Sequence, residues 1–184
     1  SNSTIAFDIN LGCSAFMYGM SVVYALMQQK GLRKALILDG ETRSKVYSPK
    51  DRRTAFLFGD GGVAALVERG ECFGKSYFSL NSDGSREGLI KVDAGGYRKM
   101  SSVETVKERV VDEYGNIRSE EQGYMYGGDV FNFVIREIPK DIKALLAYAE
   151  TDKDEFDYMV FHQANNFINS CLLYTSDAAD DSLR

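Results

Sequence analysis

The sequence predicts an α/β fold, in which short apolar strands alternate with helices that bury one face. Three segments carry this prediction. Residues 34–40 (KALILDG) contain an apolar run typical of a buried strand. Apolar residues at helical spacing follow residue 13 and occur again within residues 128–150. This alternation indicates a mixed architecture rather than an all-helical or all-β chain.

The N-terminal part is expected to form a strand followed by a helix. Residues 4–9 (TIAFDI) are rich in branched and aromatic side chains, which favours a short buried strand. After Cys13, the apolar residues at helical spacing are Phe16, Met20, Val23 and Met27. Gly31 is the expected residue just past the C-terminal end of this helix.

The middle of the chain is interpreted as strands and loops. Residues 54–68 (TAFLFGDGGVAALVE) are predicted to form two strands joined by a tight turn at 59–62, where glycines would supply positive φ angles. A phosphate-binding loop normally leads into a helix, whereas β-like residues follow here. Further short strands are predicted within residues 69–96, and the polar residues 97–126 have no assigned structure.

The C-terminal part is expected to form a long helix and one more strand. The helical stripe in residues 128–150 consists of Val130, Val134, Ile138, Ile142 and Leu145. Pro139 lies within this stripe, which predicts a kink or two helices. Residues 156–161 (FDYMVF) are predicted to form a strand with His162 at its end.

The composition is typical of a soluble globular protein, with 184 residues, 44% hydrophobic and 27% charged. A net charge of −5 argues against general nucleic-acid binding. No run approaches the ~20 apolar residues that cross a bilayer, and no signal peptide opens the chain. We therefore expect a cytoplasmic protein with neither a membrane nor a nucleic acid as partner.

The charge is nevertheless uneven along the chain. Residues 30–53 contain eight basic residues and three acidic ones. This segment is either an ordinary solvated surface or a local patch for an anionic partner, such as a phosphate or an acidic protein.

The cysteine and histidine counts limit the chemistry that is available. The three cysteines are widely spaced and include no CxxC pair, so we expect neither a disulfide framework nor a metal site. His162 is the single histidine, and any histidine chemistry must therefore use it.

Cys13 lies where the predicted strand leads into the predicted helix. The positive end of a helix dipole lowers the pKa of a thiol, and the small neighbours Gly12, Ser14 and Ala15 would let a carbonyl group approach it. The alternative is a buried structural cysteine. His162 opens a polar cluster (HQANN) at the carboxyl end of a predicted strand, where sites form in open α/β sheets.

A papain-like protease also has an early cysteine and a histidine about 130–150 residues later. The local signature differs, because GCSAF lacks that family's second cysteine and following aromatic residue. In addition, Phe7 stands where that family places its oxyanion-hole glutamine. The protease alternative is therefore disfavoured.

Three motifs instead occur in one characteristic order: FDINLGCSAF, SPKDRRTAFLFGDGGVAALV and VFHQAN. They resemble the nucleophile segment, the segment ending in the Phe-Gly-Asp-Gly turn, and the histidine motif of β-ketoacyl-acyl-carrier-protein synthase III. This is the condensing enzyme of the thiolase superfamily that initiates fatty-acid synthesis. The resemblance covers most of residues 4–168.

The resemblance implies an incomplete thiolase-like αβαβα layered fold, comprising the end of its first half and the start of its second half. Residues 1–72 would be the C-terminal part of the first half, with the nucleophilic cysteine. Residues 73–170 would be the N-terminal part of the second half, with the catalytic histidine. Residues 171–184 have an atypical composition and are expected to be a disordered or artefactual tail.

The resemblance also implies residue roles. Cys13 would be acylated by an acyl-CoA, and His162 would assist decarboxylation of malonyl-acyl-carrier protein and stabilise the enolate. Asn165 would lie beside the pantetheine arm, and Arg52 beside the CoA adenine. The substrates would be CoA and phosphopantetheine thioesters, with no further cofactor, and the enzyme would be a homodimer.

The chain departs from the family in two respects. Family members are longer and contain a second catalytic asparagine and pocket walls that this chain lacks, so we expect the chain alone to be incompetent in malonyl-dependent condensation. Phe167 stands where the family often has an arginine used with the carrier protein.

Three alternative functions remain open. One is a specialised relative that acts in secondary-metabolite or polysaccharide acylation. Another is a hydroxymethylglutaryl-CoA synthase. The third is a CoA- or acyl-binding module without catalytic activity.

Overall fold

The computed structural model describes residues 3–70 and 73–172. The chain forms two compact units, each assembled from segments that are distant in sequence. The first unit consists of Ser1–Glu41 and Gly61–Leu80, and the second of Thr42–Asp60 and Asn81–Arg184. The predicted division of the chain into two halves at residue 72 stays a prediction.

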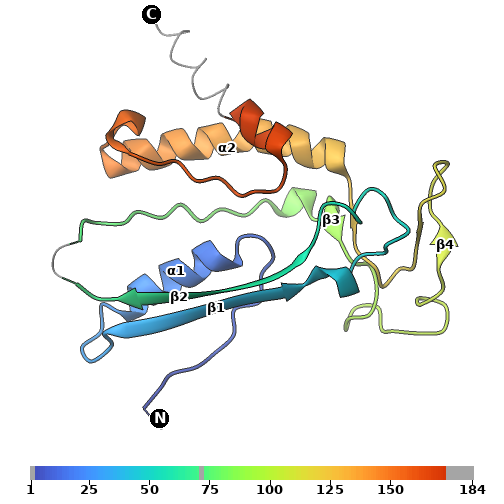
Figure 1. The fold of residues 1–184 in the computed structure, drawn as a ribbon, viewed down its shortest axis with the longest axis horizontal. Coiled ribbons are helices and arrows are strands. Elements are labelled where there is room, and N and C mark those ends of the chain that lie inside the picture. Colours follow the sequence, from blue (N-terminus) through green and yellow to red (C-terminus); the bar gives the residue numbers. More distant parts are fainter. Residues whose placement is uncertain (1–2, 71–72, 173–184) are drawn as a thin grey trace, which may run out of the picture. The chain divides into compact units, whose positions relative to one another are not determined.

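The first unit is built from one helix and two strands: α1 (Ala15–Leu26), β1 (Lys34–Thr42) and β2 (Asp60–Glu68). The two strands form a two-stranded sheet and run in opposite directions (Figure 1). An ion pair of 3.2 Å between Lys34 and Glu68 joins the same end of both strands. The predicted strand at 34–40 is therefore confirmed, and it extends to Thr42.

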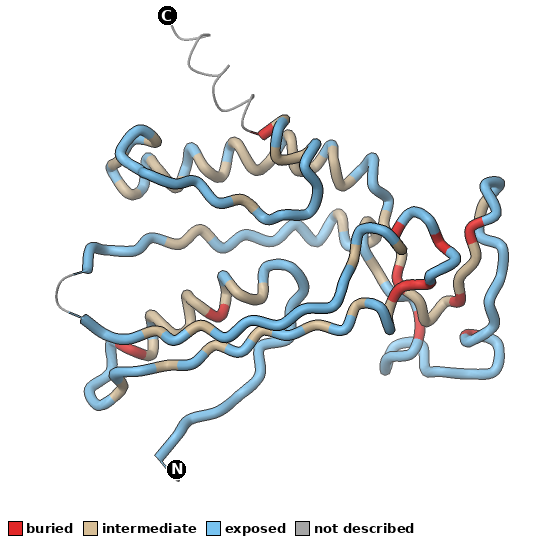
Figure 2. The backbone as a smooth tube through the Cα atoms, in the orientation of Figure 1, coloured by how far each residue is buried: buried red, intermediate tan, exposed pale blue. Residues whose placement is uncertain are grey.

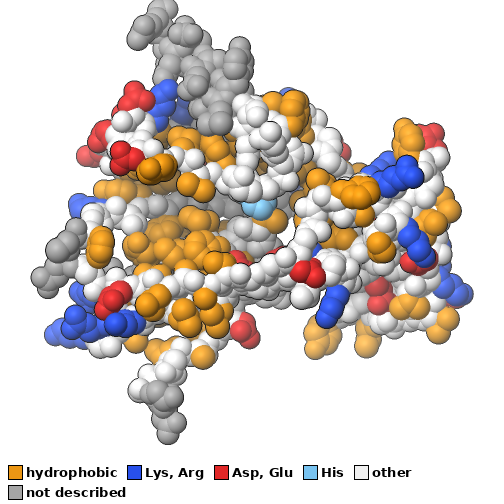
Figure 3. Space-filling model, viewed as in Figure 1, with side chains coloured by type: hydrophobic (Ala, Val, Ile, Leu, Met, Phe, Trp, Pro, Cys, Tyr) orange, Lys and Arg blue, Asp and Glu red, His pale blue; other side chains and the backbone are white. Residues whose placement is uncertain are grey.

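Helix α1 packs on the inner face of β1. Gly19 is the buried residue of the helix, and a Cβ atom there would lie 3.7 Å from Cγ2 of Ile37. Side chains of β1 alternate between the two faces, as expected for a strand. Leu36 and Leu38 lie on the outer face and are 60% and 72% exposed. Hydrophobic side chains are accordingly visible on the surface in Figure 3.

Within its described residues, the second unit contains a long helix, α2 (Gly127–Ala149), and four two-residue strands. Strand β3 (Ile90–Lys91) pairs antiparallel with β6 (Tyr124–Met125), and β4 (Arg109–Val110) with β5 (Ile117–Arg118). Three short 3₁₀ helices complete it: η1 (Arg43–Lys45), η2 (Gly84–Arg86) and η3 (Lys153–Glu155). Residues 166–172 are helical as well.

The buried residues of the second unit are mostly polar. Among the described residues, the buried polar side chains of this unit are Ser48, Asp51, Thr54, Thr105, Asn116 and Ser119. Figure 2 shows them in red in the loops around the short strands. Because a buried polar group costs free energy unless it is hydrogen-bonded, the loops of this unit are held in place by specific partners rather than by apolar packing.

The helices agree with the sequence analysis, with two differences. Helix α1 ends at Leu26, and Gly31 has a φ of +95° in the turn beyond it, so Gly31 is not the residue just past the helix end. Helix α2 is one continuous helix with Pro139 inside it, so the alternative of two helices is wrong. The apolar stripe on both sides of Pro139 is half-buried, and this partial burial outweighs the hydrogen bond that proline removes.

Three predicted strands do not form. Residues 4–9, 54–57 and 156–161 have no strand structure, and Ile5 and Phe7 are 62% and 58% exposed. A strand is stable only when its backbone groups pair with a neighbour. Among the described residues, none of these three segments has a neighbouring strand. Within residues 73–96, the only strand is β3.

The prediction of a tight turn with positive φ angles at residues 59–62 is also wrong. Among the described residues, the glycines with positive φ are Gly31, Gly95 and Gly115. The glycines at 61 and 62 instead lie inside β2, where a Cβ atom on Gly62 would lie 3.8 Å from the carbonyl oxygen of Asp39. That is an ordinary van der Waals distance, and a Cβ atom on Gly61 would have no described atom within 4 Å, so these two glycines continue the strand without a change of direction.

Candidate functional site

Cys13 is exposed and lies two residues before Ala15, the first residue of α1. The N–H of Ala15 donates to the carbonyl oxygen of Gly12 at 2.9 Å, which forms the turn that leads into the helix. The side chain of the N-cap residue Ser14 makes no capping hydrogen bond. The sulfur therefore stands at the positive end of α1, as predicted, and the alternative of a buried structural cysteine is wrong.

The space around Cys13 is open on the side of Gly12. A Cβ atom added to Gly12 would have no described atom of the rest of the chain within 4 Å. Cys171, by comparison, is half-buried, and Cys72 lies outside the described residues. Of the two described cysteines, Cys13 is thus the more exposed.

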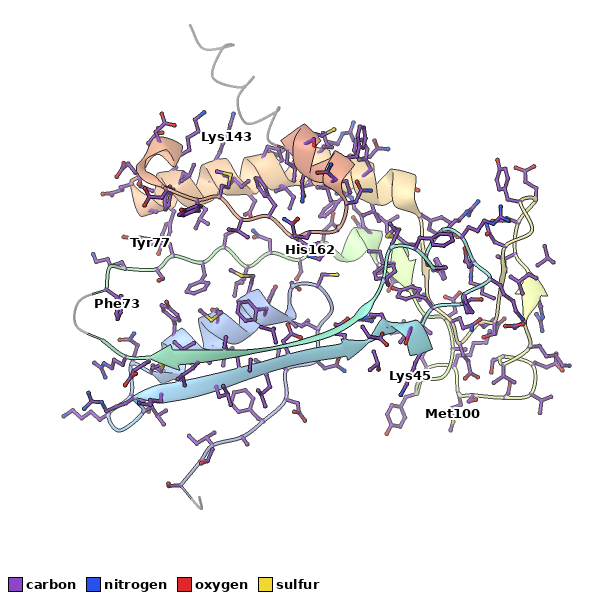
Figure 4. All side chains as sticks on the ribbon, in the orientation of Figure 1. Lys45, Phe73, Tyr77, Met100, Lys143 and His162 are labelled. Atoms are coloured by element: carbon purple, nitrogen blue, oxygen red, sulfur yellow. The ribbon has the colours of Figure 1, made fainter. Side chains whose placement is uncertain are left out.

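His162 is exposed and lies on the coil that precedes the helical residues 166–172 (Figure 4). Its imidazole is the pale blue group visible on the surface in Figure 3. The Nε2 atom of the neighbouring Gln163 donates to the carbonyl oxygen of Phe161 at 3.1 Å. The histidine is therefore presented by a loop and not by the end of a strand, contrary to the prediction.

Asn165 has a local structural role. Its Oδ1 atom accepts a hydrogen bond from the N–H of Ile168 at 3.1 Å, and its carbonyl oxygen accepts one from Asn169 at 3.2 Å. This is the geometry of a helix N-cap, so Asn165 starts the helix at 166–172. The ring of Phe167 in that helix stacks on Phe131 of α2, with 5.5 Å between the ring centroids. The loop that carries His162 is anchored to α2 through this helix.

Arg52 is exposed, and its backbone is fixed by a distant residue. Its N–H donates to Oδ1 of the buried Asn116 at 2.9 Å. The adjacent Arg53 instead forms an ion pair of 3.2 Å with Asp112. Among the described residues, no acidic group pairs with the guanidinium of Arg52. Of the two arginines in the DRR sequence, only Arg53 is therefore neutralised by an acidic partner among the described residues, which the sequence did not indicate.

Asp60, in the FGDG sequence, is held by Ser44. Its Oδ2 accepts from the Ser44 hydroxyl at 2.6 Å and its Oδ1 from the Ser44 N–H at 2.8 Å. These two hydrogen bonds, with a smaller effect from the charge of Lys45, hold the pKa of this carboxyl below its usual value. The carboxylate therefore joins the start of β2 to η1, which is a structural role.

The four predicted site residues are divided between the two units. Cys13 lies in the first unit, and Arg52, His162 and Asn165 lie in the second. Within the second unit, Arg52 is held by Asn116 and Asn165 by its own helix, at separate positions in the chain. The convergence of Cys13 and His162 on one substrate stays a prediction, as do the four assigned roles.

Sequence analysis missed Asn116 and the ion pair between Asp51 and Arg118 (2.8 Å). The turn residues in DEYGN (112–116) signal a turn there, but nothing in them identifies residues 48–55 as the partner. Among the described residues, no group of three or more potential ligands could hold a metal ion. None of the described helices has the length and apolar character needed to cross a membrane.

The arrangement of strands and helices is that of an incomplete thiolase-like α/β fold. A crystal structure of a 3-oxoacyl-(acyl-carrier-protein) synthase III matches 94% of this chain and 51% of its own, with a TM-score of 0.85 and 34% identity. The incomplete thiolase-like α/β fold that the resemblance implied is confirmed.

The sequence is similar to the same family. Residues 7–84 match the family described as 3-oxoacyl-[acyl-carrier-protein (ACP)] synthase III. The β-ketoacyl-[acyl-carrier-protein] synthase III of Clostridioides difficile is 36% identical over 160 residues, covering 87% of this chain and 46% of the relative. The β-ketoacyl-[acyl-carrier-protein] synthase III of Fusobacterium nucleatum is 34% identical over 162 residues, covering 86% of this chain and 46% of the relative.

The chain is therefore similar to the 3-oxoacyl-[acyl-carrier-protein] synthase III family, both in the segment that matches the family model and over most of its length in the relatives. It spans about half the length of the curated relatives that it matches.

Proposed function

We propose that this chain carries the nucleophile and the histidine of a condensing enzyme that initiates fatty-acid synthesis. The enzyme joins an acyl group from an acyl-CoA to malonyl-acyl-carrier protein, with loss of carbon dioxide. The observation that carries the proposal is the exposed Cys13 at the N-terminal end of α1, inside the segment that matches the family.

In the first half-reaction, the Cys13 thiolate attacks the thioester carbonyl of the acyl-CoA. A new carbon–sulfur bond forms at Cys13, the bond to the CoA sulfur breaks, and CoA leaves as its thiolate, which takes up a proton from solvent. The oxyanion of the tetrahedral intermediate needs nearby N–H donors, and the N–H of Cys13 at the start of α1 is one such donor. The open side at Gly12 gives the thioester room to approach.

In the second half-reaction, His162 donates a hydrogen bond to the thioester oxygen of the malonyl group. Negative charge accumulates on that oxygen as carbon dioxide leaves, and the resulting enolate carbon attacks the acyl group on Cys13. A carbon–carbon bond forms, the carbon–sulfur bond to Cys13 breaks, and the Cys13 thiolate is released. A donor that acts on such a transient charge typically contributes roughly 10²–10³ in rate.

The other two residues would bind the substrate. The Oδ1 atom of Asn165 accepts the hydrogen bond that caps its own helix. The Nδ2 amino group of the same side chain is therefore the group that would face a pantetheine arm. The exposed guanidinium of Arg52 would bind the nucleotide end of CoA. We propose a homodimer that acts in the cytoplasm, where acyl-CoA and carrier-protein thioesters are formed.

The decisive experiment is intact-mass measurement after incubation of the chain with acetyl-CoA. We expect a mass gain of one acetyl group that maps to Cys13 and is lost in Cys13→Ser. Cys171→Ser is the matched control, because its sulfur is half-buried, and it should retain the adduct. CoA binding without any adduct would refute the nucleophile and favour a binding module.

The role of His162 is tested separately with malonyl thioesters. His162→Ala should lower the rate of carbon dioxide release by roughly 10²–10³ while the acetyl adduct on Cys13 still forms. Equal loss of both reactions would instead indicate that the variant is misfolded, which circular dichroism would detect. A full rate of decarboxylation in a folded variant would refute the proposed role.

A further inference from the structure

We infer that residues 95–106 of the second unit form a docking surface for an anionic lipid membrane. We call this segment the 95–106 loop. It has no role in the proposed function, of which this inference is independent. It revises the expectation from the sequence that no membrane is a partner, because a loop that rests on a lipid surface needs no spanning segment.

The 95–106 loop carries its apolar side chains on the outside. Tyr97 is fully exposed, and Met100 and Val103 are 73% and 74% exposed. Val106 is 52% exposed. Figure 4 labels Met100 at the edge of the second unit. Four large apolar side chains within ten residues are thus in contact with water, which is unfavourable unless a partner covers them.

Polar groups hold the loop from its inner side. Oε1 of Glu121 accepts from the hydroxyls of Ser101 at 2.7 Å and of Thr105 at 2.5 Å. Thr105 is buried, and its carbonyl oxygen accepts the N–H of Glu120 at 3.2 Å. The N–H of the buried Ala94 donates to the carbonyl oxygen of Glu120 at 3.0 Å. This reverses the usual arrangement of apolar groups inside and polar groups outside, so burial of the exposed apolar side chains is not what holds the loop.

The charge that remains on the loop and its flank is positive. Three ion pairs form there: Lys99 with Glu120, Lys107 with Glu104, and Arg109 with the same Glu104. Because two bases share one acid, one positive charge is left over. Arg98 adds a second, since it is exposed and has no acidic partner in the part of the chain that the structure describes. Glu121 is half-buried on the inner side of the loop, so the outer side complements an anionic surface.

These side chains fit a lipid surface better than a protein partner. A stable interface between proteins involves about 20–30 residues on each side, and the four apolar side chains of one loop are too few. A lipid surface is bound by a small apolar area combined with cations that attract anionic headgroups. Tyrosine, with an apolar ring and a polar hydroxyl, is enriched at membrane–water interfaces. Because the loop is already fixed, binding costs little conformational entropy.

The test is co-sedimentation of the 184-residue chain with two kinds of vesicle. One contains phosphatidylglycerol and phosphatidylcholine, and the other contains phosphatidylcholine alone. We expect roughly tenfold tighter binding to the anionic vesicles at low salt, and loss of this preference at about 1 M salt. Arg98→Gln should weaken binding to the anionic vesicles roughly fivefold, the effect of one cation at such a surface.

The apolar contribution is tested by two exposed substitutions. Tyr97→Ser and Val103→Ser should each weaken binding to the anionic vesicles roughly tenfold. Tyr158→Ser and Val160→Ser are the matched controls, because they make the same changes at exposed positions of the same unit outside the loop. Both controls should bind like the unaltered chain, and circular dichroism should show all four variants folded.

The inference is refuted if the unaltered chain does not bind anionic vesicles, or if the two loop variants bind as tightly as their controls. Analytical ultracentrifugation of the same variants detects a different occupant. If Tyr97→Ser and Val103→Ser dissociate a dimer without changing vesicle binding, the loop is an interface between copies of the chain and the lipid proposal is wrong. Acylation of Cys13 is measured without vesicles, so the inference and the proposed function are tested separately.

Discussion

The pair formed by Asp51 and Arg118 should be the most sensitive point of the second unit. Asp51 is fully buried, and its two carboxylate oxygens accept from Arg118 Nη1 at 2.8 Å and from the N–H of Arg53 at 3.0 Å. Asp51→Ala removes both bonds and leaves the guanidinium of Arg118, whose side chain is only 16% exposed, without a counter-charge.

The expected cost follows from this burial. Breaking a buried ion pair by removing one partner typically destabilises a protein by about 3–5 kcal/mol. Arg118 keeps one favourable contact, since its guanidinium lies 5.0 Å from the centroid of the Tyr124 ring. We therefore expect Asp51→Ala to lower the free energy of unfolding by about 3 kcal/mol, the lower end of that range.

Urea unfolding followed by circular dichroism and tyrosine fluorescence measures this cost. The exposed pair between Lys34 and Glu68 is the control, and Lys34→Ala should cost about 0–1 kcal/mol. Replacing both partners with apolar residues, as in Asp51→Leu with Arg118→Met, should cost less than Asp51→Ala alone. A loss below about 1 kcal/mol for Asp51→Ala, or a double variant less stable than the single one, would contradict the argument.

Three further predictions concern stability. The pKa of the Asp60 carboxyl is lowered, first by its hydrogen bonds to Ser44, so its contribution to the free energy of unfolding is present above the ordinary carboxyl pKa and is lost as pH falls through the lower pKa of the folded state. In Ser44→Ala the urea midpoint should therefore fall less steeply on acidification than in the unaltered chain. An unchanged slope of midpoint against pH would refute this. Gly19→Ala should raise the free energy of unfolding by about 0.5–1 kcal/mol, since the new Cβ would lie at ordinary contact distance from Ile37. Gly31→Ala should lower the free energy of unfolding by about 1–2 kcal/mol, because the φ of Gly31 is +95°. Equal melting temperatures for the two glycine variants would contradict both predictions.

Part of the fold could be predicted because it depends on local pattern. Helix α1, helix α2 and strand β1 are each specified by the spacing of their own apolar residues. The strands predicted at 4–9 and 156–161 have a similar apolar content but do not form. A strand depends on a partner that its own sequence does not contain, whereas a helix satisfies its hydrogen bonds within itself.

The candidate site shows the same division. The positions of Cys13 before a helix and of His162 after an apolar segment are visible in the sequence. The sequence did not show that Arg53 is neutralised by Asp112 while Arg52 is left exposed. It also did not show that Asn165 uses its side-chain oxygen to cap its own helix.

The sequence by itself thus predicted the two long helices, strands β1 and β2, and the similarity to the family, while the roles of Cys13 and His162 stay predictions. Only the tertiary structure decided which arginine is available and what residues 109–118 hold in place. The physical reason is distance along the chain: Asn116 meets Arg52 across 64 residues, and Arg118 meets Asp51 across 67. Such contacts join polar side chains to groups that no local pattern of hydrophobicity or charge identifies.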